Sequence, residues 1–465
     1  MFPFNHIQSK RVPKTKAFVL SLPFTTSHSL SLLFLFLSLF SITQAQNITY
    51  ATDTACGCDI QYVDGIETTR NGDLYGFRRY DGTVIVPNIY RYVGQFSHGY
   101  CKVWIVDTLA VTPQGQEPPL VCGLIDTTGR EVVPCRYDDV DYPSDNRILV
   151  TKNNLFGFSD LGGNLITPIH FPMASSFQER RAVIAQYIDS FFVFYTFIDT
   201  TGRQLFPPVF QNAAPFTEGF APVYRYDRWG LIDTLGNEVL TCRFDNLTFP
   251  DHGTCFAGDS MGLALYRLPS PNHPQATRLT QPLYQPITGV TQNRIAVSRD
   301  GFQGFLDLNG NEIIPCIYDE VGLFRYGRTL ARLDNHYGII DTLGKTILPI
   351  EYENKTPKGN KYVYYDSVAL IEKEGRLSFV DLDGKLILPM RLEQAYHFSQ
   401  GLAAVRFEGH WGYINNHGDI YMPFIFDIAS PFQWNRADVF FGGHHMVIDH
   451  DGRCVKNCNG IISFR

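Results

Sequence analysis

The apolar positions of this chain come in short runs on either side of a recurring polar turn. Residues 339–341 read Ile-Ile-Asp, a glycine follows at Gly344, and residues 347–348 read Ile-Leu. Neighbouring residues of a strand point to opposite faces, so paired apolar residues predict short strands that are covered on both faces. No stretch sustains the apolar period of a helix, and the abundant Val, Ile, Phe and Tyr favour strands. The pattern therefore predicts an all-β protein.

The glycines that close these turns define a period. Successive turn glycines are 34 residues apart in five instances. The turn glycines are Gly82, Gly129, Gly163, Gly202, Gly236, Gly310, Gly344, Gly384, Gly418 and Gly452. A fixed period of this length indicates small units that bury their apolar residues only by stacking on their neighbours. We therefore expect one tandem array of repeats.

An acid three residues before most of these glycines is a turn signal. Its carboxylate can accept hydrogen bonds from the following backbone N–H groups, and glycine takes the positive φ that other residues resist. The clearest turn residues are Asp126, Gly129, Asp233, Gly236, Asp341, Gly344 and Gly418. A row of catalytic carboxylates is the alternative interpretation. A glycosidase needs only two acids across one cleft, so recurrence in nearly every unit favours a structural role.

Three further positions complete the repeat. An aromatic residue recurs seven positions before the turn glycine, usually next to a strand glycine, as at Tyr75, Trp229, Tyr337 and Trp411. Core packing over that glycine is the preferred interpretation, and a sugar-stacking platform is the alternative. A proline five positions after the turn glycine should end its strand or lie where no neighbour pairs. A later Phe-x-x-Gly predicts a bend before a third strand.

These features predict units of about three short antiparallel strands, stacked into an elongated, twisted, solenoid-like array. A closed, propeller-like ring is the alternative. The array is expected over residues 74–458, after an N-terminal cap segment at 46–73 and before a tail at 459–465. A Pro-rich stretch expands one unit at about residues 261–300. We interpret it as a decayed repeat, with a hinge or exposed loop as the alternative.

The first 45 residues predict export. Four basic residues and no acid precede a 13-residue apolar core at residues 30–42, and Ala45 supplies a small residue at the end. These are the parts of a secretory signal peptide, and the apolar core is short for the alternative, a membrane anchor. We expect a periplasmic, cell-surface or extracellular protein that contacts the membrane only through the signal segment before its cleavage.

The charge of the exported chain excludes one class of partner. Loss of the four basic residues reduces the 39 Lys and Arg to 35, against 46 Asp and Glu, which gives a net charge of −11. Such a surface repels phosphate backbones, so no nucleic-acid partner is expected.

Two groups contain metal-ligating residue types. Asp138, Asp139 and Asp141 could hold a divalent cation, but no glycine-bearing loop accompanies them and a solvated face is favoured. The second group consists of His444, His445, His450, Cys454 and Cys458. Its spacing matches no closed zinc pattern, and cysteines of exported proteins are more often oxidised. We therefore predict no metal site and no cofactor.

Export also makes the cysteines disulfide candidates. The candidates are Cys56, Cys58, Cys122, Cys135, Cys454 and Cys458. Cys122 and Cys135 stand on either side of one turn, which makes a cross-strand bridge conceivable, with buried thiols as the alternative. The two terminal pairs would each staple one end of an open array, or together clasp a ring.

The repeat resembles a known family. Residues 229–236 read Trp-Gly-Leu-Ile-Asp-Thr-Leu-Gly, and residues 411–414 read Trp-Gly-Tyr-Ile with Pro423 and Phe426 in phase. They look like the tryptophan–glycine (WG) repeat family of bacterial proteins, and the resemblance covers roughly residues 74–465. It implies an all-β, mostly exported bacterial repeat protein without known catalytic residues.

Three functions remain compatible with the sequence. The preferred one is a non-catalytic exported protein that binds or scaffolds a protein or glycan partner. A structural component of the envelope or surface is the first alternative. A polymer-degrading hydrolase is the second, although the chain has no Gly-x-Ser-x-Gly elbow, His-Glu-x-x-His motif or phosphate-binding glycine loop. We therefore predict that the protein is not an enzyme.

Overall fold

The structure is a computed structural model that describes residues 48–52, 59–63, 66–79, 81–110, 117–188, 192–353, 364–433, 435–458 and 463–464. The predicted signal segment at residues 1–45 and the candidates Cys56 and Cys58 lie outside the described residues. The chain divides into two compact units, residues 1–105 with 125–130 and residues 106–124 with 131–465. Within the described residues, no helix has the length and hydropathy to cross a membrane.

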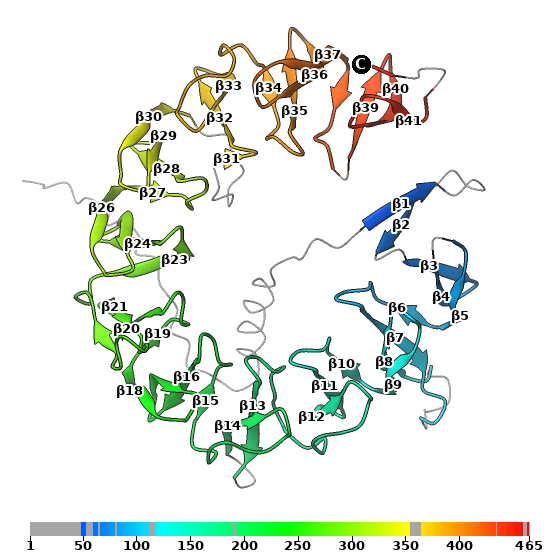
Figure 1. Cartoon of the computed structure of the whole chain (residues 1–465), viewed down its shortest axis with the longest axis vertical. Helices are drawn as coiled ribbons and strands as arrows, with labels where there is room; N and C mark the ends of the chain where they lie inside the picture. Colours follow the sequence, from blue (N-terminus) through cyan, green and yellow to red (C-terminus); the bar gives the residue numbers. More distant parts are fainter. Residues whose placement is uncertain are drawn as a thin grey trace, which may run out of the picture. The chain divides into compact units, whose positions relative to one another are not determined.

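The described residues form a succession of small antiparallel sheets (Figure 1), so the predicted all-β repeat architecture is confirmed. The first strands are β1 (Ile48–Thr52), β2 (Asp59–Val63), β3 (Ile66–Asn71), β4 (Leu74–Arg79), β5 (Val84–Tyr90), β6 (Tyr92–Val93), β7 (Tyr100–Val106), β8 (Leu120–Asp126), β9 (Glu131–Tyr137), β10 (Asp139–Val140), β11 (Arg147–Lys152), β12 (Leu155–Asp160), β13 (Arg181–Tyr187) and β14 (Val193–Asp199).

The middle strands are β15 (Asn212–Ala213), β16 (Phe220–Arg225), β17 (Arg228–Asp233), β18 (Glu238–Phe244), β19 (Asn246–Leu247), β20 (Thr254–Asp259), β21 (Gly262–Arg267), β22 (Thr277–Arg278), β23 (Gln285–Thr291), β24 (Arg294–Arg299), β25 (Phe302–Asp307) and β26 (Glu312–Tyr318). The last strands are β27 (Glu320–Val321), β28 (Arg328–Leu333), β29 (His336–Asp341), β30 (Thr346–Tyr352), β31 (Tyr364–Tyr365), β32 (Val368–Lys373), β33 (Arg376–Val380), β34 (Gln394–Ala395), β35 (Leu402–Phe407), β36 (His410–Asn415), β37 (Ile420–Phe426), β38 (Ile428–Ala429), β39 (Arg436–Phe441), β40 (His444–Asp449) and β41 (Cys454–Lys456).

A typical sheet has four strands in chain order, as in β15-β16-β17-β18. The prediction of about three strands missed the first one, because a strand of two residues such as β15 leaves no periodic signal. Its two residues pair with the end of β16, where Asn212 faces Tyr224 and Ala213 faces Val223. Several repeats described by the structure, such as β15-β18, β27-β30 and β34-β37, thus contain one short strand and three longer ones.

The Phe-x-x-Gly bend is a two-residue hairpin turn between the first and second strands. Glu218 and Gly219 have φ values of 53° and 81°. The flanking Thr217 and Phe220 exchange two backbone hydrogen bonds of 2.8 and 3.1 Å. Two successive positive φ values are typical of the type I′ turn, whose twist matches that of the strands.

The fourth strand carries a bulge that explains both the strand glycine and the proline. Tyr337 pairs with Tyr352 and Ile339 with Leu348, so two steps along β29 correspond to four along β30. Pro349 lies in this bulge, and the strand continues beyond it. Proline is tolerated there because no ladder N–H is required of a bulged residue.

The strand glycine lies under the bulge of its own repeat, as Gly230 does where β17 pairs with β18. A Cβ placed on Gly230 would come within 2.7 Å of the Leu240 carbonyl oxygen and 2.8 Å of the Cys242 backbone nitrogen. We predicted that an aromatic ring fills the space above this glycine. In the structure the backbone of the facing strand fills it, and only glycine permits so close an approach.

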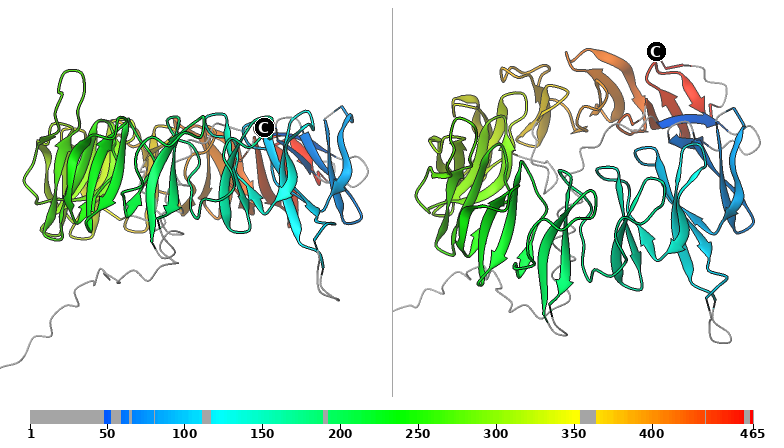
Figure 2. Two further views of the ribbon diagram at one scale, coloured as in Figure 1. Left: turned by 90° about the horizontal axis from the view of Figure 1, so that it is seen from below. Right: turned by 60° about the horizontal axis from the view of Figure 1, so that its bottom comes forward.

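The hydrophobic core lies between neighbouring sheets. One cluster joins Val183 of β13 and Phe197 of β14 to Val223 of β16 and Ile232 of β17. Similar clusters follow between later pairs of sheets. Figure 2 shows consecutive sheets of the larger unit with their faces toward one another. A sheet that lies between two others is therefore covered on both faces, as the paired apolar residues predicted.

The expanded unit is a complete four-stranded sheet, β19-β20-β21-β22. Its turn acid is replaced by Arg267, and residues 268–276 form a longer connection before β22. The unit thus keeps its four strands, and residues 270–275 of the longer connection are exposed. Its core residues Leu263 and Leu265 pack against Ile295 and Val297 of the next unit.

Candidate functional site

The turn acids bind the backbone of their own turns. Asp233 accepts hydrogen bonds through Oδ1 from the N–H groups of Leu235 and Asn237, both at 2.9 Å, and Gly236 donates to its carbonyl at 3.0 Å. The same pattern occurs at Asp126, Asp341 and, with an amide in place of the acid, Asn415. The turn glycines Gly129, Gly236, Gly344 and Gly418 all have φ between 81° and 86°.

These hydrogen bonds lower the pKa of several turn acids. Backbone and side-chain donors of Asn164 hold the pKa of Asp160 below its ordinary value of 3.8. At Asp233 burial raises the pKa, but donors on Asn237 and Leu235 outweigh burial and the net shift is downward. A lowered pKa keeps these groups ionised at neutral pH. It does not suit a general acid, whose pKa must be raised.

The two-residue turns between the first and second strands form a chain of hydrogen bonds from unit to unit. The side chain at the first turn position accepts from a backbone N–H of the next unit's turn. The bonds run from Arg180 to Asp145, Gly219 to Glu179, Gly253 to Glu218, Gly327 to Gln292, Gly401 to Asp366 and Asn435 to Gln400. Their lengths are 2.5 to 2.9 Å. We call this set of contacts the turn seam.

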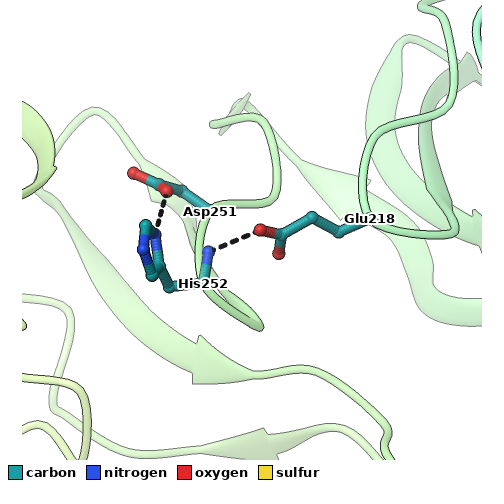
Figure 3. A group of neighbouring side chains, drawn as sticks. All are labelled: Glu218, Asp251 and His252. Atoms are coloured by element: carbon teal, nitrogen blue, oxygen red, sulfur yellow. Dashed lines mark hydrogen bonds and ion pairs between the residues drawn. The ribbon is translucent and has the colours of Figure 1, made fainter.

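One point of the turn seam brings together three groups able to bind a metal. Ligand atoms of Glu218, Asp251 and His252 lie within 4.8 Å of one another, the one such cluster found among the described residues (Figure 3). Asp251 precedes the turn and His252 occupies its first position, while Glu218 comes from the preceding unit. We did not predict this cluster, because Glu218 belongs to another unit than Asp251 and His252 and meets them only through stacking.

The oxygens of this cluster are engaged by the protein. The carboxylate of Glu218 accepts from the backbone N–H groups of His252 (2.9 Å) and Gly253 (2.8 Å). Asp251 Oδ1 lies 2.6 Å from His252 Nδ1, and Asp251 Oδ2 accepts from the Val290 N–H at 2.6 Å. Carboxylate oxygens of this kind can bind a cation, and a carboxylate beside an imidazole can act as an acid–base pair. Here the contacts join three consecutive units, which favours a structural role.

Members of the two groups with metal-ligating residue types bind separate partners in the structure. Asp138 binds Lys152 at 3.3 Å, and Asp141 accepts from Ser176 at 2.6 Å. The C-terminal histidines also have separate partners, since His445 Nε2 lies 2.6 Å from Asp438 Oδ1 and His450 Nε2 lies 2.9 Å from the Gln400 carbonyl oxygen.

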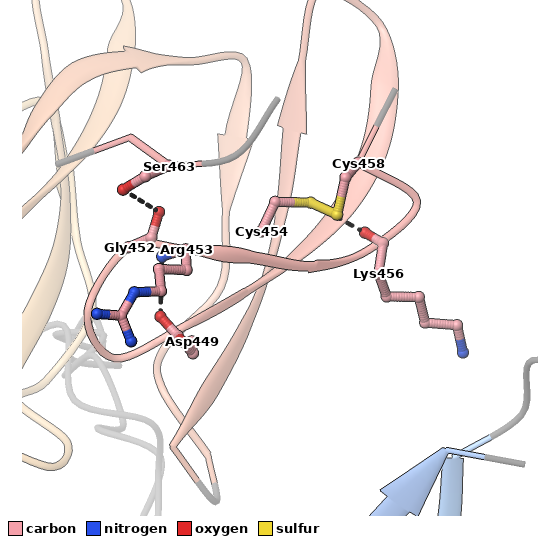
Figure 4. Close-up of a disulfide and its surroundings, with 7 residues drawn as sticks. All are labelled: Asp449, Gly452, Arg453, Cys454, Lys456, Cys458 and Ser463. Carbon is pink, nitrogen blue, oxygen red and sulfur yellow. Dashed lines mark hydrogen bonds between the residues drawn. A yellow bond between two sulfur atoms is a disulfide. The ribbon is translucent and has the colours of Figure 1, made fainter. Parts of the chain in front are cut away.

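Among the described residues, the cysteines divide into one disulfide and six thiols. Cys454 and Cys458 form a disulfide next to the last turn, where Ser463 donates to the Gly452 carbonyl (Figure 4). The structure retains Cys122 and Cys135 as thiols, so the cross-strand bridge that their spacing made conceivable is not formed, and the alternative of thiols holds.

Side-chain direction explains the missing bridge. The sulfur of Cys135 would lie 2.7 Å from a Cβ on Gly123, so Cys135 lies over the strand at that glycine. Cys122 is the neighbouring residue of the same strand and therefore points to the other face. Burial, together with the nearby Glu131 carboxylate, raises the pKa of Cys135 to about 12, so this thiol is a weak nucleophile at neutral pH.

The repeat aromatics pack on their own and adjoining strands. Trp229 contacts Tyr224 with ring centroids 5.0 Å apart, and Trp411 is buried and stacked on Tyr396 at 5.4 Å. Tyr75 lies beneath the Arg70 guanidinium at 5.5 Å. Tyr337 borders a small apolar hollow. The structure therefore places these rings in packing positions.

Comparison with known proteins identifies the repeat. A model of the WG containing repeat matches residues 123–156, 195–227, 229–257, 304–335, 337–354, 378–409 and 411–443. No curated protein matches the sequence.

Several solved structures show distant similarity to the chain. A eukaryotic initiation factor is 11% identical over 72% of this chain and 92% of that chain, with a TM-score of 0.32. The extracellular domain of a hybrid two-component system from B. thetaiotaomicron is 10% identical over 78% and 64%, with a TM-score of 0.22. PorZ, a surface component of the type-IX secretion system of Porphyromonas gingivalis, is 10% identical over 83% and 51%, with a TM-score of 0.22. Similarity at this level carries no functional information.

Proposed function

The chain belongs to the WG-repeat family, and from this premise we propose that it is an exported, non-catalytic protein that binds or scaffolds a protein or glycan partner. The signal-like segment at residues 1–45 supports export to the periplasm, the cell surface or the medium. The negative charge of the remaining chain argues against a nucleic-acid partner.

One observation carries the binding proposal: the repeated polar groups are used inside the repeat. Carboxylates such as Asp233 and Glu218 accept several backbone hydrogen bonds, which suits the joining of strands and units. Specificity for a partner must then come from residues that differ between copies of the repeat. Many of these residues lie in exposed connections between strands. Binding surfaces commonly reside on such connections above a rigid scaffold.

The test is a binding screen of residues 46–465, purified from an oxidising compartment. A glycan array and affinity capture with an identified, reproducible partner should yield saturable binding. Turnover of a polymer by the purified protein would contradict the non-catalytic proposal. Retention in the envelope fraction without any saturable partner would instead favour the structural alternative.

A further inference from the structure

Three consecutive units expose large apolar side chains at the same kind of hairpin. Tyr226 and Met261 lie in the connections between the second and third strands, and Phe302 is the first residue of the third strand β25. These side chains are 75%, 87% and 45% exposed. Tyr187 and Phe192 are exposed at the matching hairpin of the preceding unit. In the next unit the equivalent turn is Asp334-Asn335, beside Leu333, which is 37% exposed. The turns of later units contain polar residues and glycine, namely Glu374, Gly375, Glu408, Gly409, Gly442 and Gly443. We call Tyr226, Met261 and Phe302 the tip row.

The strand order places the tip row on one edge of the array. In an antiparallel sheet, the turns that join strands one to two and three to four lie at one end, and the turn that joins strands two to three lies at the other. The turn seam links the first kind of turn across neighbouring units, through Glu218 to Gly253 and Asp251 to Val290. The second kind must therefore line the opposite edge. Neighbouring packed sheets are about 10 Å apart, which sets the approximate spacing of the row.

The charge around the tip row is acidic. Three arginines lie beside the row, and each has an acidic partner within its own unit. Arg225 lies over the Tyr226 ring at 4.6 Å and 3.8 Å from Glu238. Arg228 binds Asp245 at 2.7 Å, and Arg299 binds Glu312. The carboxylates at the tips meet neutral donors instead. Asp227 accepts from the Gln211 side-chain amide at 3.0 Å, and Asp259 accepts from the Met261 N–H at 2.8 Å. The row thus combines exposed apolar side chains with the carboxylates of Asp227, Asp259 and Asp300, which form no salt bridge within the part of the chain that the structure describes.

From this combination we infer that the tip row is a docking surface for a basic protein segment that offers apolar side chains or pockets at matching intervals. This inference rests on the proposed binding function and assigns it a surface and a partner class. Aromatic residues, Met and Arg are enriched where proteins bind each other, and a polar rim commonly surrounds such anchors. A cationic partner complements the tip carboxylates, and their attraction increases its rate of association.

The same charges argue against a lipid surface as the occupant. Anionic bilayers attract basic segments, whereas Asp227, Asp259 and Asp300 would carry negative charge to the headgroups. Apolar residues that anchor proteins at membranes are usually accompanied by Lys and Arg free to contact phosphates. A protein partner with Lys or Arg beside its apolar contacts fits both features of the row.

The test selects binders from a random 12-residue peptide phage library on residues 46–465. The variant combines Tyr226→Asn, Met261→Ser and Phe302→Ser; asparagine is chosen at position 226 because Tyr226 has a φ of 53°. The matched control is Leu235→Ser with Leu343→Ser, since these leucines are 77% and 71% exposed at the turns of the opposite edge. Unchanged thermal unfolding verifies that both variants fold.

We expect the selected peptides to be rich in Lys or Arg next to apolar residues. Their affinity should fall about tenfold or more on the tip-row variant and change less than about twofold on the control. Asp227→Asn with Asp259→Asn and Asp300→Asn should weaken the same peptides and flatten their salt dependence.

Three results would overturn the inference. The first is a selection that yields no binder. The second is a set of binders that retain full affinity for the tip-row variant. The third is tip-dependent binding of anionic phosphatidylglycerol vesicles to the wild type. A glycan or protein partner that binds the tip-row variant normally would show that the tip row is not the docking surface, while leaving the proposed function intact. Absence of any saturable partner in the wider screen would contradict the proposed function itself.

Discussion

At the scale of single residues, the strand glycines are sites of close backbone approach. Replacing Gly230 with Ala forces the added Cβ against the Leu240 carbonyl and the Cys242 backbone nitrogen. Neither is the end of a flexible side chain, so the bulge must move. We expect Gly230→Ala to lower the free energy of unfolding by about 1–3 kcal/mol.

Urea denaturation at neutral pH measures this effect. Thr241→Ala, an exposed position on the facing strand, is the matched control and should change stability by less than about 0.5 kcal/mol. Equal stability of Gly230→Ala and the wild type would show that the bulge adapts without cost.

The lowered pKa values of the turn acids predict that the stability of the fold decreases at acidic pH. The folded pKa values of Asp160 and Asp233 lie below the ordinary 3.8, so each contributes stability that is present above that value. The contribution is lost as the pH falls through the lower, folded value. Asparagine keeps the accepting oxygen and does not titrate, as Asn415 shows by accepting from His417 at 3.0 Å and Asp419 at 2.9 Å.

The double variant Asp160→Asn with Asp233→Asn should therefore lose less stability than the wild type between pH 7 and pH 3. Denaturant midpoints at the two pH values measure the difference. An equal loss in both proteins would mean that these two carboxylates do not contribute to acid unfolding.

At the scale of the repeat, the turn seam couples neighbouring units. Glu218 has a φ of 53°, so Asn is a suitable short replacement that tolerates this backbone but cannot span the same distance. Glu218→Asn should destabilise the protein by about 1–2 kcal/mol through the loss of the bonds to His252 and Gly253. Glu218→Gln should cost less, because Gln292 and Gln400 accept equivalent bonds elsewhere in the seam.

Hydrogen exchange distinguishes this mechanism from a general loss of stability. The amides of His252 and Gly253 should exchange faster in Glu218→Asn, whereas the Asn435 amide, bound by Gln400, should remain protected. Uniform acceleration across all units would contradict a local coupling role.

At the scale of the whole molecule, the export prediction concerns the mature chain. Full-length protein expressed in a secreting bacterium should lose its first 45 residues and begin at Gln46. Intact-mass measurement and N-terminal sequencing of the exported protein test this cleavage. A protein that retains residues 30–42 and remains in the membrane fraction would support an uncleaved anchor instead.

Much of the architecture was predictable because its signals are local. The paired apolar residues, the turn acids and the period of 34 residues predicted an all-β array of stacked units. The Phe-x-x-Gly signal predicted a bend, although its type I′ geometry and its bonds to the next unit were not foreseen. The two-residue strands and the bulge over Gly230 were missed, because pairing rather than residue type defines them.

The contrast reflects the range of the interactions. Turns and strand periodicity depend on residues a few positions apart, so residue order carries them. The cluster of Glu218, Asp251 and His252, the separation of Cys122 from Cys135 and the alignment of the tip row depend on stacking between residues far apart in the chain. Those arrangements emerge only when each sheet buries its faces against its neighbours, because packing sets which side chains meet.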